Sequence, residues 1–526
     1  MTRTFAPALA ATLLFVCDAA LAQSAEIGVD ALVQRLGATT PNGSGVVVGQ
    51  VEILESPGNY GPNQTSAEFT GKAFIAQSGS PGNSGHATLV AQLMFGKTAG
   101  MAPGISTIYL YEAASWAQTA FLRMNQGSLN PPLAPPGGLK IFNHSWVGSF
   151  NVALNTDALR RADFAVWNPT TNQAPANQPL MIVGVNNAGG GQAPLMCHMF
   201  NGISVGLSNG AHVSGPTSIT YDGPNRMKPE VVAPSQFTSF ACPLVDAVAA
   251  RLVQTARTAP LNTNPNAERA DVLKAVIMAG CDHRAAWTNC TGGCVSGATR
   301  GTTSAPLDAV YGSDVVNINN SHLILTGLEQ AGANTPPTSV NIKRRGWDFT
   351  NIGANASKYY RFHISAVAPQ ASILIAWNRN VNSDLVTWSL ANFTLTLHRV
   401  DTSGNLTTLV GNPGLPFFSS GNVVSQSSVD NVEHVFVRDL QPGDYTVQVQ
   451  RIDALGGTRD VAIAWLLPKK LGDINEDGSV NVNDLLAVIN SWGSCPPPCL
   501  PACLADVDGN CAVNVNDLLA VINTWG

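Results

Sequence analysis

The sequence predicts an α/β fold with a parallel sheet covered by helices on both faces, followed by an all-β sandwich and a small α-helical module. From about 30 to 330, short apolar runs such as "GVVVGQV" and "LMIVGV" alternate with Ala-rich stretches such as "HATLVAQLMFG". Short buried strands that alternate with helices are typical of a parallel sheet. After residue 334 the pattern changes to period two, and near the end "VNVNDLLAVIN" occurs twice, at 480–490 and 513–523.

The length and composition bound the organisation of the chain. A chain of 526 residues is too long for one core, so several domains are expected. The changes of pattern predict a signal peptide at 1–22, the α/β domain at 23–333, the sandwich at 334–468 and the small module at 469–526. Charged residues make up 12% of the chain and the net charge is −6, without clusters of Lys and Arg. This composition argues against a nucleic-acid partner.

The first residues indicate export. The stretch "MTRTFAPALAATLLFVCDAALAQ" places one Arg before an apolar run and ends in small residues at Ala20-Leu21-Ala22, which is typical of a signal-peptide cleavage site. We expect a mature chain that begins near Gln23 and is secreted, either extracellular or associated with the cell surface. Because no later segment reaches the ~20 uninterrupted apolar residues that a membrane span needs, none is expected.

Cysteine usage agrees with an oxidising compartment. One of the ten cysteines, Cys17, lies in the signal segment, which leaves nine and therefore disulfides with at least one spare thiol. Two clusters stand out, and they contain Cys281, Cys290 and Cys294, and then Cys495, Cys499, Cys503 and Cys511. Zinc is the rival interpretation for the second cluster, although its C-x3-C-x3-C spacing fits no common zinc motif.

The segment from 334 to 468 reads as a β-sandwich. Runs such as "ASILIAW", "NFTLTLHRV" and "VEHVFVRDL" alternate with period two and are separated by turn residues. No catalytic constellation is visible in this segment.

The duplicated module carries two candidate calcium loops. "DINEDGSVNVND" and "DVDGNCAVNVND" place oxygen-bearing side chains at loop positions 1, 3, 5, 9 and 12, which suits Ca²⁺. The predicted ligands are Asp473, Asn475, Asp477, Asn481 and Asp484 in the first loop, and Asp506, Asp508, Asn510, Asn514 and Asp517 in the second. Cys511 stands where the first loop has Gly478. This difference weakens the second site unless a disulfide from Cys511 to an upstream cysteine fixes the turn.

Each loop leads into a helix whose apolar residues share one face. These residues are Leu485, Val488, Ile489 and Trp492, and in the second copy Leu518, Val521, Ile522 and Trp525, so two such faces could pack on one another. The duplicated loop and helix resemble dockerin type I modules, which implies Ca²⁺ and a cohesin-type or cell-surface partner. A calcium-stabilised cap without a partner is the alternative.

The stretch "QFTSFACPLVDAVAARL" raises the question of catalysis. Ser239 is either a cap of the helix that follows or a nucleophile, and a nucleophile needs a base. His86 opens the helical stretch "SGHATLVAQLMFGKTAGMAPG", which resembles the histidine motif of subtilisin-like serine peptidases. The stretches "IFNHSWVG", "MIVGVNNAGG" and "RMKPEVVAP" followed by "TSFACPLVDAVAARL" then appear in that family's order. The resemblance implies a subtilisin-like fold for this part of the chain.

Carried over residue by residue, the resemblance makes Ser239 the nucleophile, His86 the base and Asn187 the oxyanion donor. It assigns Ser145, Trp146 and Gly148 to the strand that pairs with the substrate backbone. The acid departs from the family, because Glu52 stands at the strand-end position that usually holds Asp, with Glu55 three residues on. The side chain of Glu is one methylene longer, which adds roughly 1.5 Å of reach.

Further departures surround these motifs. Leu89 replaces a second His, and Phe237 stands where a Gly usually precedes the Thr-Ser pair. Cys242 is either a packed thiol or the partner of Cys197. We expect a secreted serine endopeptidase that acts on protein or peptide substrates through a Ser/His/Glu triad and is anchored by its C-terminal module. The alternative, motivated by Glu52 and Phe237, is an impaired pseudopeptidase that serves as a surface binding or adhesion protein.

Overall fold

The computed structural model describes residues 22–168, 174–188, 195–289, 301–364, 367–409, 423–467, 472–475, 480–495, 503, 505–507 and 512–525. The predicted signal peptide, apart from its last residue, lies outside this set. None of the helices described there is long and apolar enough to cross a membrane.

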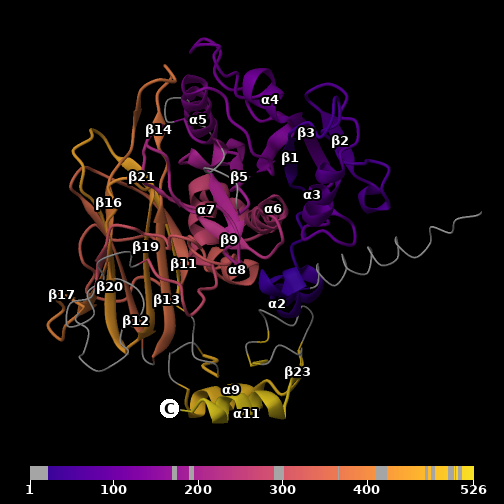
Figure 1. Ribbon diagram of the computed structural model, residues 1–526. Helices are drawn as coiled ribbons and strands as arrows, with labels where there is room; N and C mark the ends of the chain where they lie inside the picture. Colours follow the sequence, from indigo (N-terminus) through magenta and orange to yellow (C-terminus); the bar gives the residue numbers. More distant parts are fainter. Residues whose placement is uncertain are drawn as a thin grey trace, which may run out of the picture.

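The first part of the chain is built on a seven-stranded sheet in which every neighbouring pair is parallel. The strand order is β2-β3-β1-β4-β5-β6-β9 (Figure 1). These strands are β1 (Val47–Glu52), β2 (Ala73–Ala76), β3 (Thr107–Glu112), β4 (Leu139–His144), β5 (Leu180–Gly184), β6 (Ile203–Leu207) and β9 (Val231–Ala233). β5 and β6 are buried along their whole length, as expected for a parallel sheet covered on both faces.

The described helices of this part of the chain pack around the sheet and on one another. They are α2 (Val29–Leu36), α3 (Gly85–Phe95), α4 (Ala113–Ser115), α5 (Val152–Val166), α6 (Thr238–Ala256), α7 (Ala270–Ala279) and α8 (Ile318–Thr326). α3 and α6 contact each other, and Asn143 of β4 donates to Asp246 of α6 at 2.7 Å. The neighbouring side chain in β4, Phe142, instead meets the Trp116 ring on the opposite face. Because successive side chains of a strand alternate between faces, both faces are packed, and the predicted α/β fold is confirmed.

Two sheets follow and confirm the predicted all-β part. One has the order β11-β21-β13-β19 and the other β10-β18-β16-β20-β12, with β17 beside β16. All these pairs are antiparallel except β10 with β18. The bounds are β10 (Thr302–Thr303), β11 (Arg345–Ile352), β12 (Ser357–Ile364), β13 (Ala368–Ala376), β16 (Phe393–Val400), β17 (Leu406–Thr408), β18 (Val424–Ser425), β19 (Val432–Leu440), β20 (Gly443–Arg451) and β21 (Arg459–Leu466). Ahead of the C-terminal module, two short antiparallel pairs lie outside these sheets in the described residues, β7 (Gly215–Pro216) with β8 (Met227–Lys228) and β14 (Asn380–Val381) with β15 (Trp388–Ser389).

The four-stranded sheet belongs to two cores at once. On one face, Leu374 and Ala464 lie in the core of the α/β part, where α7 packs against β13 and β21 (Figure 1). On the other face, Ile373 and Ile463 lie in the core between the two β-sheets. The period-two pattern seen in the sequence therefore reflects burial on both faces rather than one buried and one solvent-facing side.

In the described residues of the C-terminal module, the helices are α9 (Val482–Asn490) and α11 (Val515–Asn523), and β22 (Gly493–Ser494) pairs antiparallel with β23 (Ala512–Val513). The helices contact each other, and Val488 and Val521 are fully buried between them. The expectation that the whole apolar face of each helix packs inward is wrong in part. Ile489 and Trp492 are about half exposed, as are their counterparts Ile522 and Trp525, because the interface between two short helices is narrower than their apolar stripe.

Candidate active site

Glu52 and His86 form the centre of the candidate site. Glu52 is the last residue of β1 and is only 1% exposed, and its Oε2 lies 3.0 Å from Nδ1 of His86 in the first turn of α3. The Nδ1–H group donates this hydrogen bond when the carboxyl is ionised, which leaves Nε2 of the neutral ring as a proton acceptor. The pair therefore has the arrangement of a general base held by an acid.

The start of α3 settles which glutamate orients the ring. Glu55 accepts the backbone N–H of Gly85 at 2.6 Å, and the Ser84 hydroxyl accepts the N–H of Ala87. Glu55 thus serves the exposed N-terminus of α3, where a negative charge is favourable. Glu52 is the carboxyl that bonds the imidazole.

Burial and charge act on the pair in opposite directions. Burial by itself would lower the pKa of His86, but the hydrogen bond and charge of Glu52, together with the charge of Glu55, raise that pKa above its ordinary value. Burial raises the pKa of Glu52, and the hydrogen bonds from His86 and Gln50 oppose this rise.

Gln50, which the sequence analysis did not single out, is part of the same network. It lies two residues before Glu52 on the same face of β1 and is 2% exposed. Its Nε2 donates to Oε1 of Glu52 at 3.1 Å and to the backbone carbonyl of Ala87 at 2.8 Å. The available signal was a lone amide in the otherwise apolar strand "VVVGQVE", in phase with the acid.

Ser239 lies in the first turn of α6, whose N-terminus faces α3. The N-cap residue of α6 is Phe237, which makes no side-chain cap bond. Ser239 is therefore not the cap of this helix. No hydrogen bond joins Ser239 to His86 in the part of the chain that is described. The two helices meet here through Phe240, whose ring stacks on the imidazole with centroids 5.6 Å apart, and Phe237 meets Phe240 edge-on at 5.8 Å. Catalytic hydrogen bonds are often open in ligand-free enzymes.

Asn187 has a defined orientation beside Ser239. Its Oδ1 accepts the backbone N–H of Thr238 at 2.9 Å and the Thr238 hydroxyl at 3.1 Å. Because a backbone N–H can only donate, the carbonyl end of the amide must face Thr238, and the NH₂ end points the other way. Thr238, also absent from the predicted set, therefore fixes the donor end of Asn187.

The predicted substrate strand lies mostly inside the protein. Ser145 and Trp146 follow β4 and are buried, and Trp146 donates through Nε1 to Nδ1 of His144 at 3.2 Å. Gly148 is half-buried and its carbonyl accepts the N–H of Leu195. These residues, Glu52 and Asn187 lie at or after the carboxyl ends of parallel strands. Such folds commonly place their sites at the carboxyl ends of the sheet strands.

The three described cysteines of the α/β part are thiols, whereas Cys290 and Cys294 lie outside the described residues. Cys197, Cys242 and Cys281 are buried and free, so the suggested bond between Cys242 and Cys197 is not present. Cys242 lies one turn after Ser239 and its thiol approaches the carbonyl of Ile182 at 3.4 Å. Burial raises the pKa of these thiols, which makes them poor nucleophiles.

In the first candidate calcium loop, both ends are buried carboxyls. Asp473 and Asp484 are fully buried, and Oδ1 of Asp484 accepts the N–H groups of Ile474 and Asn475. Asn481 caps α9 in a capping box with Asp484. Asp477 lies outside the described residues.

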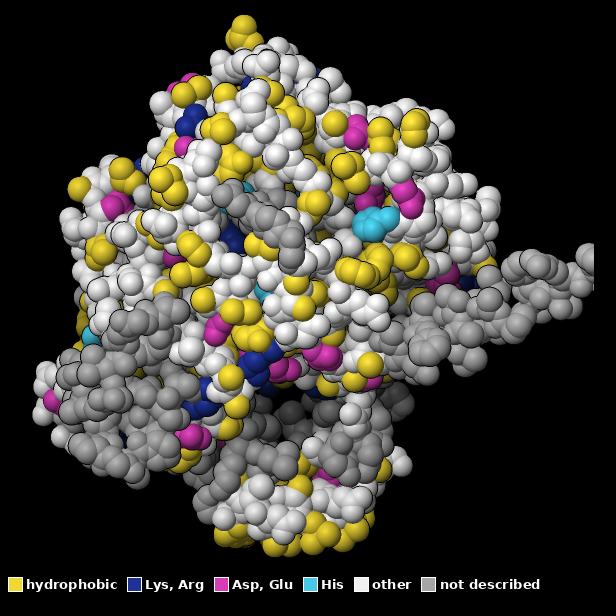
Figure 2. Space-filling model, in the orientation of Figure 1, with side chains coloured by type: hydrophobic (Ala, Val, Ile, Leu, Met, Phe, Trp, Pro, Cys, Tyr) yellow, Lys and Arg dark blue, Asp and Glu magenta, His cyan; other side chains and the backbone are white. Residues whose placement is uncertain are grey.

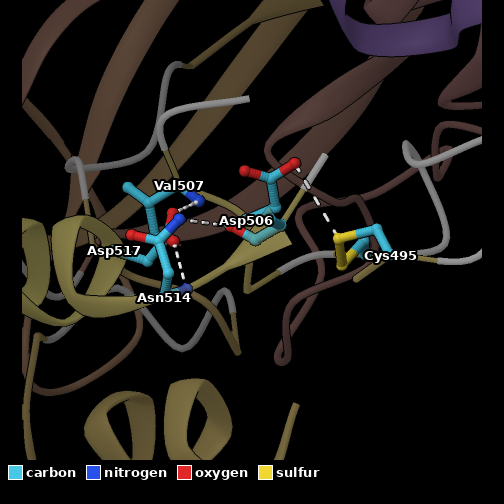
Figure 3. Close-up of a disulfide and its surroundings, with 7 residues drawn as sticks. Cys495, Asp506, Val507, Asn514 and Asp517 are labelled. Carbon is cyan, nitrogen blue, oxygen red and sulfur yellow. Dashed lines mark hydrogen bonds between the residues drawn. A yellow bond between two sulfur atoms is a disulfide. The ribbon is translucent and has the colours of Figure 1, made fainter. Parts of the chain in front are cut away.

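The second loop repeats this geometry (Figure 3). Asp517 accepts the N–H of Val507 at 2.5 Å and that of Asn514 at 2.8 Å, and Asn514 caps α11. Asp506 is buried, with its Oδ2 3.9 Å from Sγ of Cys495. Asp508 and Asn510 fall outside the described set, within which no group of three or more His, Cys, Asp or Glu side chains is gathered so as to hold a metal ion.

A disulfide joins Cys495 to Cys503 and lies beside the second loop (Figure 3). This bond supports the disulfide interpretation of the C-terminal cluster over the zinc one, because an oxidised pair provides no thiolate ligands. Cys499 and Cys511 lie outside the described residues.

Comparisons with known proteins give one family match. Residues 471–526 match the family model of the dockerin type I domain. None of the curated proteins matches the chain. Among solved structures, a mutant of the protease domain of PatA is similar at 13% identity and a TM-score of 0.35, over 55% of this chain and 98% of that one.

Two further solved structures show a similar degree of likeness. One is a cold adapted subtilisin-like serine proteinase, at 16% identity and a TM-score of 0.26, over 44% of this chain and 82% of that one. The other is a protease from Pseudoalteromonas arctica, at 15% identity and a TM-score of 0.34, over 54% and 91%. The parallel sheet with helices on both faces agrees with the resemblance to the subtilisin-like fold, and residues 471–526 of the chain belong to the dockerin type I family.

Proposed function

We propose that the protein is a secreted serine endopeptidase that hydrolyses peptide bonds with Ser239, His86 and Glu52 and is anchored through its C-terminal dockerin domain. The observation that carries this proposal is the hydrogen bond of 3.0 Å between the buried Glu52 and His86, at the end of α3 that meets the start of α6 through Phe240. A buried carboxyl bonded to Nδ1 leaves Nε2 as the base, which is the chemistry that a serine nucleophile requires.

In the proposed reaction the Ser239 hydroxyl attacks the substrate carbonyl while Nε2 of His86 takes its proton. The charged imidazole is stabilised by Glu52 and then gives the proton to the leaving amine, and a water molecule completes hydrolysis of the acyl intermediate by the same route. The oxyanion lies where the NH₂ end of Asn187 and the backbone N–H of Ser239 point. That N–H belongs to the first turn of α6, where a residue has no helical carbonyl four positions earlier to accept its N–H.

Apolar side chains surround the proposed machinery and indicate the substrate class. Ile53 and Leu54 follow Glu52, Leu89 lies one turn after His86, and Phe237 precedes the nucleophile by two residues. All four are between 41% and 50% exposed. Figure 2 shows hydrophobic side chains gathered on the face over α3 and α6. We infer that peptides with large apolar side chains near the scissile bond are preferred, since such contacts favour binding by removing apolar surface from water.

The dockerin domain is proposed to bind Ca²⁺ and a cohesin-type partner on the cell surface or a scaffold. Asp473, Asp484, Asp506 and Asp517 are buried carboxyls, and burying several ionised carboxyls in one small module is costly unless a cation compensates them. The ten predicted oxygen ligands would hold two ions, which would supply charge compensation and fix the loops. The exposed apolar residues of α9 and α11 give a partner an uncharged surface to cover (Figure 2).

Labelling by a fluorophosphonate probe tests the enzymatic part. Such a probe reacts with a serine only when a base and an oxyanion site are already in place. The purified full-length protein should be labelled, and labelling should disappear in both Ser239→Ala and His86→Ala. A folded protein that resists the probe would contradict the proposal.

A pseudopeptidase with a surface binding or adhesion role is the second candidate, and one observation favours it. The Phe240 ring stacks on the imidazole, and no hydrogen bond between Ser239 and His86 is found in the described part of the chain. If Phe240 blocks the base, Phe240→Ala should convert an unreactive protein into one that the probe labels. Absence of labelling in both forms would support the adhesion role.

A further inference from the structure

We propose that Gln50 is a positioning residue, which fixes the carboxylate of Glu52 against the first turn of α3 so that a glutamate does the work of the shorter aspartate. This inference rests on the proposed peptidase function, and it assigns a role to a residue that touches neither substrate nor nucleophile.

The geometry uses both hydrogens of the Gln50 amide. Nε2 donates to Oε1 of Glu52 at 3.1 Å and to the carbonyl of Ala87 at 2.8 Å, and Ala87 is the residue directly after His86. Oε2 of Glu52 meets His86 at 3.0 Å. The two carboxylate oxygens therefore have different partners, and one amide joins the acid to the backbone that carries the base.

A glutamate needs such a clamp more than an aspartate does. Its side chain has one more rotatable bond, so more conformational freedom must be lost to hold the carboxylate in one orientation. Gln50 and Glu52 are 2% and 1% exposed, so no bulk water competes for the carboxylate oxygen. Hydrogen bonds to a charged, buried group are among the stronger ones in proteins and fix its direction.

The carbonyl oxygen of the Gln50 side chain indicates that the NH₂ group is the functional end of this amide. Among the residues that the structure describes, Oε1 of Gln50 is buried and finds no hydrogen-bond partner. Burying an unpaired polar atom is unfavourable, and an apolar side chain of the same size in β1 would avoid that cost. The amide is therefore explained by what its NH₂ group holds, rather than by the packing of the strand.

The test compares Gln50→Met with the unchanged full-length chain. Met keeps the unbranched shape and apolar packing of the site but removes both donors. We expect the second-order rate of fluorophosphonate labelling to fall about ten- to a hundredfold. The titration of His86, followed by NMR of histidines labelled at Cε1, should shift to lower pH because the carboxylate that raises its pKa is no longer held in place.

A matched control separates positioning from general loss of stability. Gln178 is equally buried but lies before the start of β5, at the opposite end of the sheet, where its Oε1 accepts the N–H of Ala270. Gln178→Met should leave both the labelling rate and the His86 titration unchanged. Equal effects of the two Gln→Met variants would overturn the positioning role.

A double-variant cycle tests whether Gln50 acts through Glu52. In a Glu52→Gln background, Gln50→Met should cost little further labelling rate, whereas independent roles would give multiplied losses. The His86 titration needs no catalysis and can be repeated in Ser239→Ala. If the unchanged protein is not labelled, the peptidase proposal fails and the titration alone decides the role of Gln50. If it is labelled and Gln50→Met changes neither readout, the inference about Gln50 fails while the peptidase stands.

Discussion

Oε2 of Glu52, the last residue of β1, lies 3.0 Å from Nδ1 of His86. The side chain of Glu52 is one methylene longer than that of an aspartate. The carboxyl is held on its other oxygen by Gln50 and is almost completely buried. The longer side chain of Glu52 is thus held by Gln50, which lies on the same face of β1. Glu52, His86 and the backbone at the start of α3 form one hydrogen-bonded unit.

The first prediction concerns the acid itself. Glu52→Ala should lower kcat by roughly four decades, because the imidazole loses both its orientation and the charge that stabilises its protonated form. The kcat of Glu52→Asp should lie between those of the unchanged protein and Glu52→Ala, because the shorter side chain cannot contact both Gln50 and His86. Steady-state hydrolysis of a peptide substrate checks both variants, and a Glu52→Ala enzyme with unchanged kcat would remove Glu52 from the triad.

The second prediction is the pH dependence of the base. The pKa of His86 is raised above 6.5, so kcat/KM and probe labelling should increase with pH through a midpoint above 6.5. The stability that the pair contributes has the opposite trend: it is fully present below pH 6.5 and is lost as pH rises through the folded-state pKa. Glu52→Gln removes the charge of Glu52, which raises the pKa of His86, so the rate midpoint of this variant should move to lower pH. A midpoint that stays in place would contradict the coupling.

The third prediction tests the amide beside the nucleophile. Asn187→Ala should lower kcat by about 10²–10³ with little change in KM, because the lost donor acts mainly on the oxyanion of the transition state. Thr238→Val, which removes the hydroxyl that helps to orient the amide but keeps the backbone donor, should give a smaller loss. Comparable kinetics for Asn187→Ala and the unchanged enzyme would exclude Asn187 from the oxyanion site.

The fourth prediction concerns a buried charge cluster of Lys228 in β8, Glu230 directly before β9 and Lys274 in α7. Glu230 is almost fully buried, 2.6 Å from Nζ of Lys228 and 2.9 Å from Nζ of Lys274. Burial alone would raise the pKa of Glu230, but the two ammonium groups lower it to about 2. Glu230→Gln should destabilise the fold by about 3–5 kcal/mol, because two buried cations lose their counterion.

Urea unfolding measures the stability that this cluster contributes. Repeating the measurement at decreasing pH gives a second readout. The contribution of Glu230 should be fully present above pH 4.5, the ordinary pKa of a glutamate, and lost as pH falls toward about 2. Arg257→Gln is the control, because it breaks the half-buried ion pair with Glu268 and should cost about 1 kcal/mol or less.

The fifth prediction is metal binding by the dockerin domain. Calorimetric titration of the calcium-stripped full chain should show up to two Ca²⁺ sites, and Asp473→Asn should remove one of them. Asp401→Asn makes the same charge change on an exposed turn of the sandwich and should leave the stoichiometry unchanged. No binding heat with a well-folded chain would exclude the calcium assignment.

The sequence predicted the parallel sheet because buried strands carry a clear signal, as in "LMIVGV". It also predicted a helix after each of the two loops in the C-terminal module. Glu52 was named from its strand-end position, and the hydrogen bond to His86 agrees with that choice over Glu55. The spacing of residues along a strand was enough to predict which glutamate lies beside the histidine, while the catalytic role of Glu52 stays a prediction.

Other features depend on which segments meet in space. The role of Gln50 depends on the backbone of Ala87, 37 residues away, and the orientation of Asn187 depends on Thr238, 51 residues away. The stacking of Phe240 on His86 and the outward direction of Ile489 and Trp492 likewise follow from helix packing. Periodicity places a residue on a face, but it does not say how wide the interface on that face is.

The sheet of β11, β21, β13 and β19 has a consequence for how the chain folds and how it can be divided. Leu374 and Ala464 complete one core while Ile373 and Ile463 complete the other, so neither core is sealed without the same four strands. A chain cut after residue 333 would remove β11, β13 and β21, which pack on α7, and would expose part of this otherwise fully buried helix to water. The β-sheets are therefore an integral part of the α/β fold rather than a separable domain, and the two cores should melt together as one cooperative unit.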